Sequence, residues 1–135
     1  MDAINQPLLD VRDLSVAFGA TLAVDQVSFS IRRGECVALV GESGSGKSVS
    51  SLSILKLLPY PSASHPSGSI RFKGQELIDR SEREMREIRG SDISIIFQEP
   101  MTSLNPLHTI EAQIGEILSL HSGIGGQAAR DRAAA

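Results

Sequence analysis

Apolar and polar residues alternate in two stretches near the start of the chain. From Leu14 to Phe18, and again from Val27 to Ile31, every second residue is a large apolar one, with small side chains between them. A period of two places such side chains on one face of an extended segment. The pattern therefore predicts two half-buried β-strands.

Two further runs are apolar without alternation. "CVALV", Cys36 to Val40, follows the turn "RRGE", and "DISIIFQ" runs from Asp92 to Gln98. A continuous apolar run of this length is typical of a strand covered on both faces, as in a parallel sheet. We expect two such strands, with the thiol of Cys36 buried in the first.

Three segments show the spacing of helices. "KSVSSLSILKLL", Lys47 to Leu58, has leucines on one face and stops before Pro59. "SEREMREIR" begins with Ser81 and Glu84 at the spacing of a capping box, with an apolar face of Met85 and Ile88.

The third helix is expected to begin after Thr109 as its N-cap. Its predicted inner face is made of four apolar residues, Ile110, Ile114, Ile117 and Leu118. The Pro- and Ser-rich segment 59–68 is predicted to be a loop, followed by a short strand, "SIRFKG".

Composition narrows the class of protein. The chain of 135 residues has a net charge of -3 and 4% aromatic residues, so neither a basic surface nor a base-stacking platform for nucleic acid is expected. A single cysteine excludes an internal disulfide.

No apolar run approaches the ~20 residues that cross a bilayer, and the start lacks the features of a signal peptide. We expect a cytoplasmic protein.

The segment Gly41–Ser48, "GESGSGKS", satisfies the pattern G-x-x-x-x-G-K-[ST] between the expected strand and helix. Glycines let consecutive backbone N–H groups point into one concavity, and the start of the following helix favours an anion there. Lys47 adds a charge that reaches the β- and γ-phosphates, and Ser48 offers a hydroxyl to Mg²⁺. The pattern predicts a nucleotide-phosphate site.

Two other interpretations of this segment are less consistent with the sequence. A flexible Gly/Ser linker would not be enclosed between a buried strand and an amphipathic helix. A dinucleotide-binding fingerprint requires G-x-G-x-x-G, which the spacing of Gly41, Gly44 and Gly46 does not match.

The chain resembles the ATP-binding subunits of ABC transporters in two runs, "VDQVSFSIRRGECVALVGESGSGKSV" and "IIFQEPMTSLNPLHTI". More narrowly, it resembles the branch that imports oligopeptides, dipeptides and solutes such as nickel. The resemblance extends from about Leu8 to the end of the chain. It implies an α/β fold of the P-loop NTPase type, with an antiparallel β subdomain and part of a parallel-sheet core, truncated within the helical subdomain. The implied domains are 1–97, the β subdomain and phosphate loop, and 98–135, the Q-loop and the start of the helical subdomain.

The resemblance also implies roles for individual residues. Gln98 matches the glutamine that approaches Mg²⁺ and the attacking water, and Phe18 occupies the position of an aromatic residue that stacks on adenine, although it also continues the inward face of its strand. Catalytic roles fall to Lys47 and Gln98, and metal ligation to Ser48 and Gln98. The nucleotide-binding residues implied are Phe18, Gly41, Glu42, Ser43, Gly44, Ser45, Gly46, Lys47, Ser48 and Val49.

Three parts of the family's ATPase are not found in the chain: an apolar strand ending in Asp-Glu, a Leu-Ser-Gly-Gly-Gln signature and a switch histidine. "GIGGQAAR", Gly123 to Arg130, lacks the Leu-Ser pair and is interpreted as a turn between two helices. His65, His108 and His121 precede any position for the switch. We therefore expect this chain alone to bind ATP weakly, to be inactive as an ATPase and to express poorly.

The resemblance predicts the ATP-binding subunit of an importer for peptides or related solutes, using ATP and Mg²⁺. Its implied partners are transmembrane permease subunits, contacted by residues 99–106, and a second nucleotide-binding domain in a head-to-tail dimer, with no nucleic acid. Its implied location is the cytoplasmic face of the inner membrane. The alternatives are a non-catalytic nucleotide-binding or interaction module and, with less support, a small-molecule kinase, which would not explain "FQEPMTSLNP".

Overall fold

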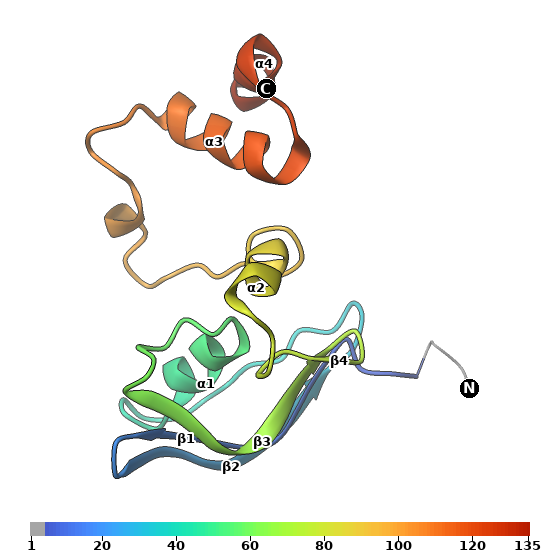
Figure 1. Ribbon diagram of the computed structural model, residues 1–135, viewed down its shortest axis with the longest axis vertical. Helices are drawn as coiled ribbons and strands as arrows, with labels where there is room; N and C mark the ends of the chain where they lie inside the picture. The colour runs from blue at the N-terminus through green and yellow to red at the C-terminus, as the bar shows by residue number, and fades with distance from the viewer. Residues whose placement is uncertain (1–4) are drawn as a thin grey trace. The chain divides into compact units, whose positions relative to one another are not determined.

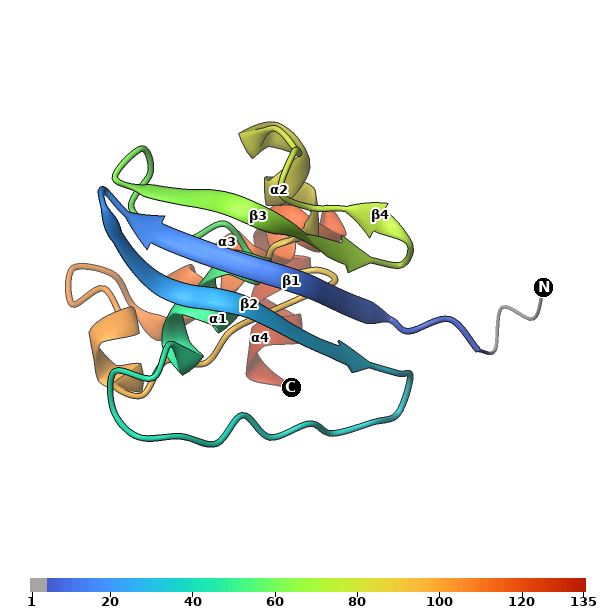
Figure 2. The same ribbon diagram turned by 90° about the horizontal axis from the view of Figure 1, so that it is seen from below.

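In the computed structural model, which describes residues 5–135, the alternating segments form an antiparallel hairpin of β1 (Leu9–Phe18) and β2 (Thr21–Ile31). Strand β3 (Ala63–Phe72) pairs with the other edge of β1, and the short β4 (Gln75–Glu76) pairs with β3. The sheet order is β2-β1-β3-β4 (Figure 2). The two predicted half-buried strands are therefore confirmed, and both are longer than the alternation alone indicated.

Irregular pairing interrupts all three long strands near their middle. Asp13 on β1 and Gln26 on β2 have left-handed backbones, with φ of 45° and 48°, and Gly68 on β3 has φ of 99°. Register shifts between β1 and each neighbour fall beside these residues, and a further shift on each side follows before Ala17. The extra residue at Asp13 moves the inward positions from Leu9 and Val11 to Leu14 and Val16, all of them buried.

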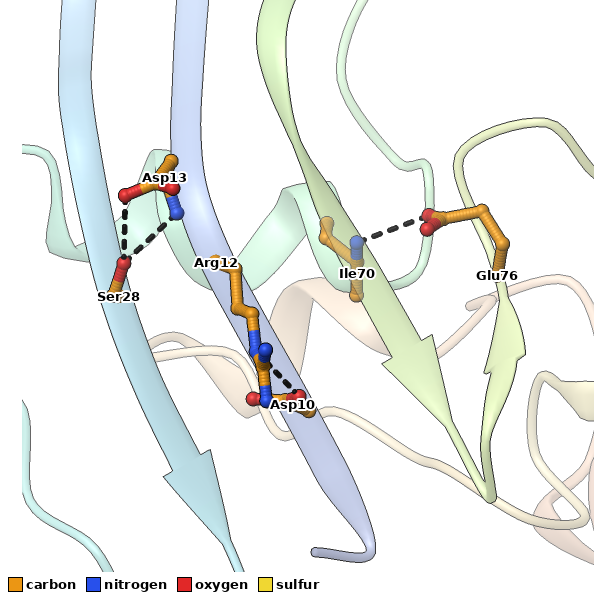
Figure 3. A network of polar contacts seen from close by, with 6 residues as sticks. All are labelled: Asp10, Arg12, Asp13, Ser28, Ile70 and Glu76. Atoms are coloured by element: carbon orange, nitrogen blue, oxygen red, sulfur yellow. Dashed lines mark hydrogen bonds and ion pairs between the residues drawn. The ribbon is translucent and has the colours of Figure 1, made fainter.

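Polar side chains replace ladder bonds at these irregular positions. The Ser28 hydroxyl accepts from the Asp13 amide at 2.8 Å (Figure 3). The Ser67 hydroxyl donates to the Asp13 carbonyl at 3.1 Å and shares a hydrogen bond with the Ser15 hydroxyl at 2.9 Å. At the other edge of β3, the Glu76 carboxylate accepts from the Ile70 amide at 3.0 Å (Figure 3). The bonds at Asp13 satisfy backbone groups beside the bulge, and the Glu76 carboxylate satisfies the Ile70 amide just beyond the residues of β3 that pair with β4.

The prediction of a loop over residues 59–68 is wrong for its second half, because β3 begins at Ala63. Pairing with β1 overrides the local preference of the Pro- and Ser-rich sequence. Pro66 cannot donate to a ladder, and it lies where the β1–β3 register shifts between its neighbours Ser64 and Ser67.

Helix α1 (Lys47–Ile54) contacts β1 and β2 on one face of the sheet (Figure 1). It is shorter than predicted, because Lys56 adopts a left-handed backbone with φ of 51° before Pro59 is reached. Leu55 and Leu58 are buried beyond its end. Helix α2 (Glu82–Ile88) begins with the predicted capping box: the Glu84 carboxylate accepts from the Ser81 amide at 2.8 Å.

The two predicted parallel strands do not form. Residues 36–40 form no strand, and of the expected strand 92–98 the structure retains an isolated bridge between Ile93 and Arg89, with residues 94–97 in no strand. The side chains of Val40 and Ile96 are 92% and 91% exposed. Cys36 is exposed as well, so its predicted burial is wrong. A covered strand needs a neighbour at each edge and a layer on each face, and no segment of residues 5–135 supplies these to either run.

The described chain divides into two compact units, one ending at Arg86 and the other covering residues 87–135. The second contains a 3₁₀ turn (Pro100–Ser103), α3 (Ile110–Ser122) and α4 (Gly126–Ala134). Thr109 caps α3 as predicted, accepting from the Ala112 amide at 3.2 Å. The turn predicted within "GIGGQAAR" is confirmed by Gly123, which ends α3.

The predicted burial of the apolar face of α3 is wrong. Ile110 is 61% exposed, Ile117 is 58% exposed, and α3 contains no buried residue. Helix α4 contacts α3, but Ile110 and Ile117 stay largely exposed and Leu118 is only half-buried. None of the helices formed by residues 5–135 has the length and hydropathy that a bilayer crossing requires.

Candidate phosphate-binding loop

The loop predicted from the glycine pattern leads directly into α1. Its turn is closed by the Ser45 amide, which donates to the Glu42 carbonyl at 3.1 Å. Gly46 is the N-cap of α1 and has φ of 92°, in the left-handed region. A Cβ at Gly46 would lie 3.1 Å from the Ala23 carbonyl oxygen and from a Val24 methyl group. The loop therefore rests on β2 at a position where only glycine fits without strain.

Lys47 folds back over this loop. Its ammonium group donates to the Gly41 carbonyl, to the Glu42 carbonyl at 2.8 Å and to the Ser45 hydroxyl at 3.3 Å. All three acceptors are neutral, whereas a phosphate oxygen is charged and accepts a stronger hydrogen bond. The ammonium group therefore lies at the concavity of the loop, where a phosphate oxygen is able to replace its neutral acceptors.

The N-terminus of α1 is open to an anion. No side chain caps its first turn, and no acidic residue lies in that turn. Free amides at a helix start, together with the positive end of the helix dipole, favour a negative ligand. The serines further along do not compete, because Ser51 and Ser53 donate back to the carbonyls of Lys47 and Val49.

The predicted loop residues are accessible. Glu42, Ser43, Gly44, Ser45 and Ser48 are exposed, and Val49 is half-buried. The Ser48 hydroxyl stands in the first turn of α1, at the end where an anion is favoured.

The side chains around the loop suit a magnesium ion bound together with phosphate better than a metal site formed by the protein alone. Among residues 5–135, no group of three His, Cys, Asp or Glu side chains is placed to hold a metal ion. Mg²⁺ prefers oxygen ligands and commonly takes several of them from the substrate phosphates and water. The Ser48 hydroxyl suits that arrangement as one protein oxygen among ligands from phosphate and water.

Phe18 lies at the end of β1 and is half-buried. Phe18 pairs with Thr21 on β2. Val24, which lies beside Gly46, pairs with Val16, two residues before Phe18 on the same strand. Two residues of strand span about 7 Å. Phe18 therefore belongs to the same end of the hairpin as the loop, and its role in stacking on adenine stays a prediction.

Gln98 belongs to the second unit and has an exposed side chain. Its approach to the metal and to Ser48 also stays a prediction. The contacts of Ala23 and Val24 beneath Gly46 were not anticipated from the sequence, because the alternation from Val27 to Ile31 gave no sign that β2 begins at Thr21.

A glycine-rich loop that presents amides and one lysine at the start of a helix is the arrangement typical of the P-loop class of proteins. Comparison with known proteins places the chain within one family of that class: the ABC transporter family model matches residues 24–135. The chain belongs to the ABC transporter family.

Curated relatives match nearly the whole chain. It is 69% identical over 131 residues to the "Peptidoglycan transport ATP-binding protein YejF" of Agrobacterium fabrum, 94% of this chain and 24% of that protein. It is 50% identical to the "Dipeptide transport ATP-binding protein DppD" of Bacillus subtilis (93% and 38%), and 47% identical to the "Oligopeptide transport ATP-binding protein OppD" of the same organism (93% and 36%). The chain thus spans only a quarter to two fifths of these relatives' length.

Proposed function

We propose that the chain is the nucleotide-binding part of an ATP-driven importer of peptides or related solutes. The open start of α1, with the Lys47 ammonium held at the loop, is the observation that carries this proposal. The printed names of the relatives, which refer to dipeptide, oligopeptide and peptidoglycan transport, support the class of solute.

In this proposal the residues of the loop bind and orient the triphosphate. The amides of the loop and of the first turn of α1 donate to phosphate oxygens, and the Lys47 ammonium exchanges its carbonyl acceptors for phosphate. Ser48 and Gln98 would hold Mg²⁺, which when bound offsets the charge of the phosphates. Catalysis then consists of positioning and charge stabilisation, as is general for phosphoryl transfer.

The partners proposed are membrane subunits, contacted by the segment after Gln98, and a second nucleotide-binding domain. Association with membrane subunits would place the protein at the cytoplasmic face of the inner membrane.

The test is Mg-ATP binding by the full-length protein, measured by isothermal titration. Lys47→Ala should weaken binding at least tenfold, because it removes the mobile cation of the site. Lys73→Ala is the matched control, since Lys73 lies over the Phe72 ring at 5.0 Å and not in the loop. Equal affinities of the wild-type protein and Lys47→Ala would contradict the proposal.

A second candidate is a nucleotide-binding module without turnover. For these 135 residues alone, this candidate is favoured by segment 36–40, directly before the loop. The segment is exposed and pairs with no strand, so the loop has no strand to hold it on that side. Phosphate release by this chain should then equal the background, whereas the full-length protein hydrolyses ATP. Turnover by the 135-residue chain that Lys47→Ala abolishes would exclude this candidate.

A further inference from the structure

Helix α1 ends in a turn that places a lysine where glycine is the usual residue. The Leu57 amide donates to the Leu52 carbonyl at 3.0 Å, and the Lys56 amide donates to the Ser53 carbonyl at 3.1 Å. These two bonds form a Schellman motif, in which the residue after the C-cap has a left-handed backbone. Lys56 occupies that position with φ of 51°. Since glycine adopts this conformation without strain and lysine does not, we looked for a compensating role of the Lys56 side chain.

The side chain of Lys56 reaches the start of α2. Its ammonium group donates to the Arg80 carbonyl at 2.7 Å. Arg80 directly precedes Ser81 and Glu84, the two residues of the capping box, and lies in no helix or strand itself. A hydrogen bond from a charged donor is stronger than one between neutral groups. This bond therefore joins the C-terminal end of α1 to the N-terminal end of α2.

The charge of Lys56 also acts on side chains of α2 and β3. The hydrogen bond from the Ser81 hydroxyl contributes most to lowering the pKa of Glu84, and the charge of Lys56 lowers it further. On β3, burial lowers the pKa of His65, and the charge of Lys56 adds to that effect. The half-buried Lys56 side chain thus lies among groups of two other elements.

The opposite end of α1 is the candidate phosphate-binding loop. Gly46 rests there against Ala23, whereas segment 36–40 before the loop pairs with no strand. Helix α1 has eight residues and is about 12 Å long, so a rotation at one end redirects the amides at the other. Leu55 is buried at the C-terminal end, but apolar packing is non-directional. The bond from Lys56 to Arg80 is directional, and it is therefore the contact suited to fix the rotation of α1.

We propose that Lys56 is a positioning residue for the phosphate-binding site: it fixes α1 against the start of α2 and so orients the amides and the Ser48 hydroxyl at the other end of α1 for phosphate binding. This inference rests on the proposed function. Glycine would relieve the backbone at position 56 but could not form the bond to Arg80. Lysine at this position therefore destabilises the turn locally and fixes the helix.

The first experiment separates stability from nucleotide binding in the full-length protein. Lys56→Gly and Lys56→Met both remove the ammonium group, so each should lower Mg-ATP affinity in isothermal titration about fivefold, the effect of one hydrogen bond. In urea, Lys56→Gly should be the more stable of the two, because glycine suits the left-handed backbone. Lys56→Arg keeps a charged donor and should restore the affinity.

Lys73 provides the matched control for both substitutions. It also has a left-handed backbone, with φ of 50°, but it lies in the turn between β3 and β4. Lys73→Gly and Lys73→Met should show the same order of stability with no change in Mg-ATP affinity. Wild-type affinity in both Lys56 variants would overturn the proposal, and so would an affinity that follows the unfolding midpoint.

The second experiment measures amide hydrogen exchange in the same full-length proteins without nucleotide. The Ser50 amide donates to the Gly46 carbonyl at 2.9 Å in the first turn of α1. Its exchange in Lys56→Met should rise about threefold or more, while exchange at Val11 within the sheet is unchanged. Unchanged exchange at Ser50 would overturn the positioning role and leave the proposed function intact. If the wild-type protein does not bind Mg-ATP, the proposed function fails and this inference with it.

Discussion

Gly46 of the candidate phosphate-binding loop lies against the backbone of Ala23 on β2, and a Cβ at Gly46 would stand 3.1 Å from the Ala23 carbonyl oxygen. This contact joins the loop to the antiparallel sheet. The position of the loop, and of the helix start that follows it, is therefore set by a strand about twenty residues earlier in the chain.

Gly46→Ala is expected to destabilise the loop more than Gly44→Ala. Both glycines have left-handed backbones, which cost an alanine about 1–2 kcal/mol, but only Gly46 has neighbours within reach of an added methyl group. Unfolding in urea should show the larger loss for Gly46→Ala, and Mg-ATP affinity should fall with it. Equal losses for the two variants would contradict the contact with β2.

Gly68→Ala is expected to disturb the sheet severely. An added Cβ would lie 2.5 Å from the Asp13 carbonyl oxygen and from the Leu14 Cα, and Gly68 has φ of 99°. Strain and overlap together should cost about 3 kcal/mol of unfolding free energy. Gly74→Ala is the matched control, since Gly74 has φ of 77° and open space around it. A similar midpoint of denaturation for both variants would show that the strands separate freely at the bulge.

The capping box of α2 should make stability depend on acidic pH. The pKa of Glu84 is lowered, first by the hydrogen bond from the Ser81 hydroxyl and then by the bond from the Ser81 amide. A carboxyl whose folded pKa lies below its unfolded pKa stabilises the fold above the unfolded value, and this stabilisation is lost as pH falls through the folded pKa. The difference in unfolding free energy between wild type and Glu84→Ala should therefore shrink below about pH 4.5. Glu87→Ala is the control, and a difference that grows in acid would contradict the assignment.

His65 should produce a second pH dependence, nearer neutrality. Burial lowers the pKa of His65, and the charge of Lys56 lowers it further, while its ring nitrogen Nε2 shares a hydrogen bond with the Tyr60 hydroxyl. Because the folded state disfavours the protonated ring, stability is full above pH 6.5 and is lost as pH falls from there through the depressed pKa.

The change in unfolding free energy between pH 8 and pH 5 should therefore be smaller in His65→Gln than in the wild type. His108→Gln is the control, since His108 is exposed. In Lys56→Met, the NMR titration of His65 should move to higher pH. A titration of His65 above 6.5 in the wild type would refute the burial argument.

Local chemistry in the sequence was sufficient to predict most helices and the loop. The capping boxes and caps at Ser81 and Thr109 act over three residues, so they form wherever the helix does. The pattern from Gly41 to Ser48 likewise determines its own turn and the start of α1, because its hydrogen bonds join residues no more than six positions apart.

Only the tertiary structure decided where the strands pair and bulge, and which apolar runs are covered. β3 forms from a Pro- and Ser-rich segment because β1 offers it an edge, and Asp13, Gln26 and Gly68 acquire left-handed backbones because neighbouring strands meet there out of register. The runs at 36–40 and 94–97 have the composition of strands but stay unpaired, because a strand is stable only through hydrogen bonds and packing supplied by other segments. Helices and turns carry their own hydrogen bonds, so the sequence determines them, whereas sheets depend on partners that the local sequence does not specify.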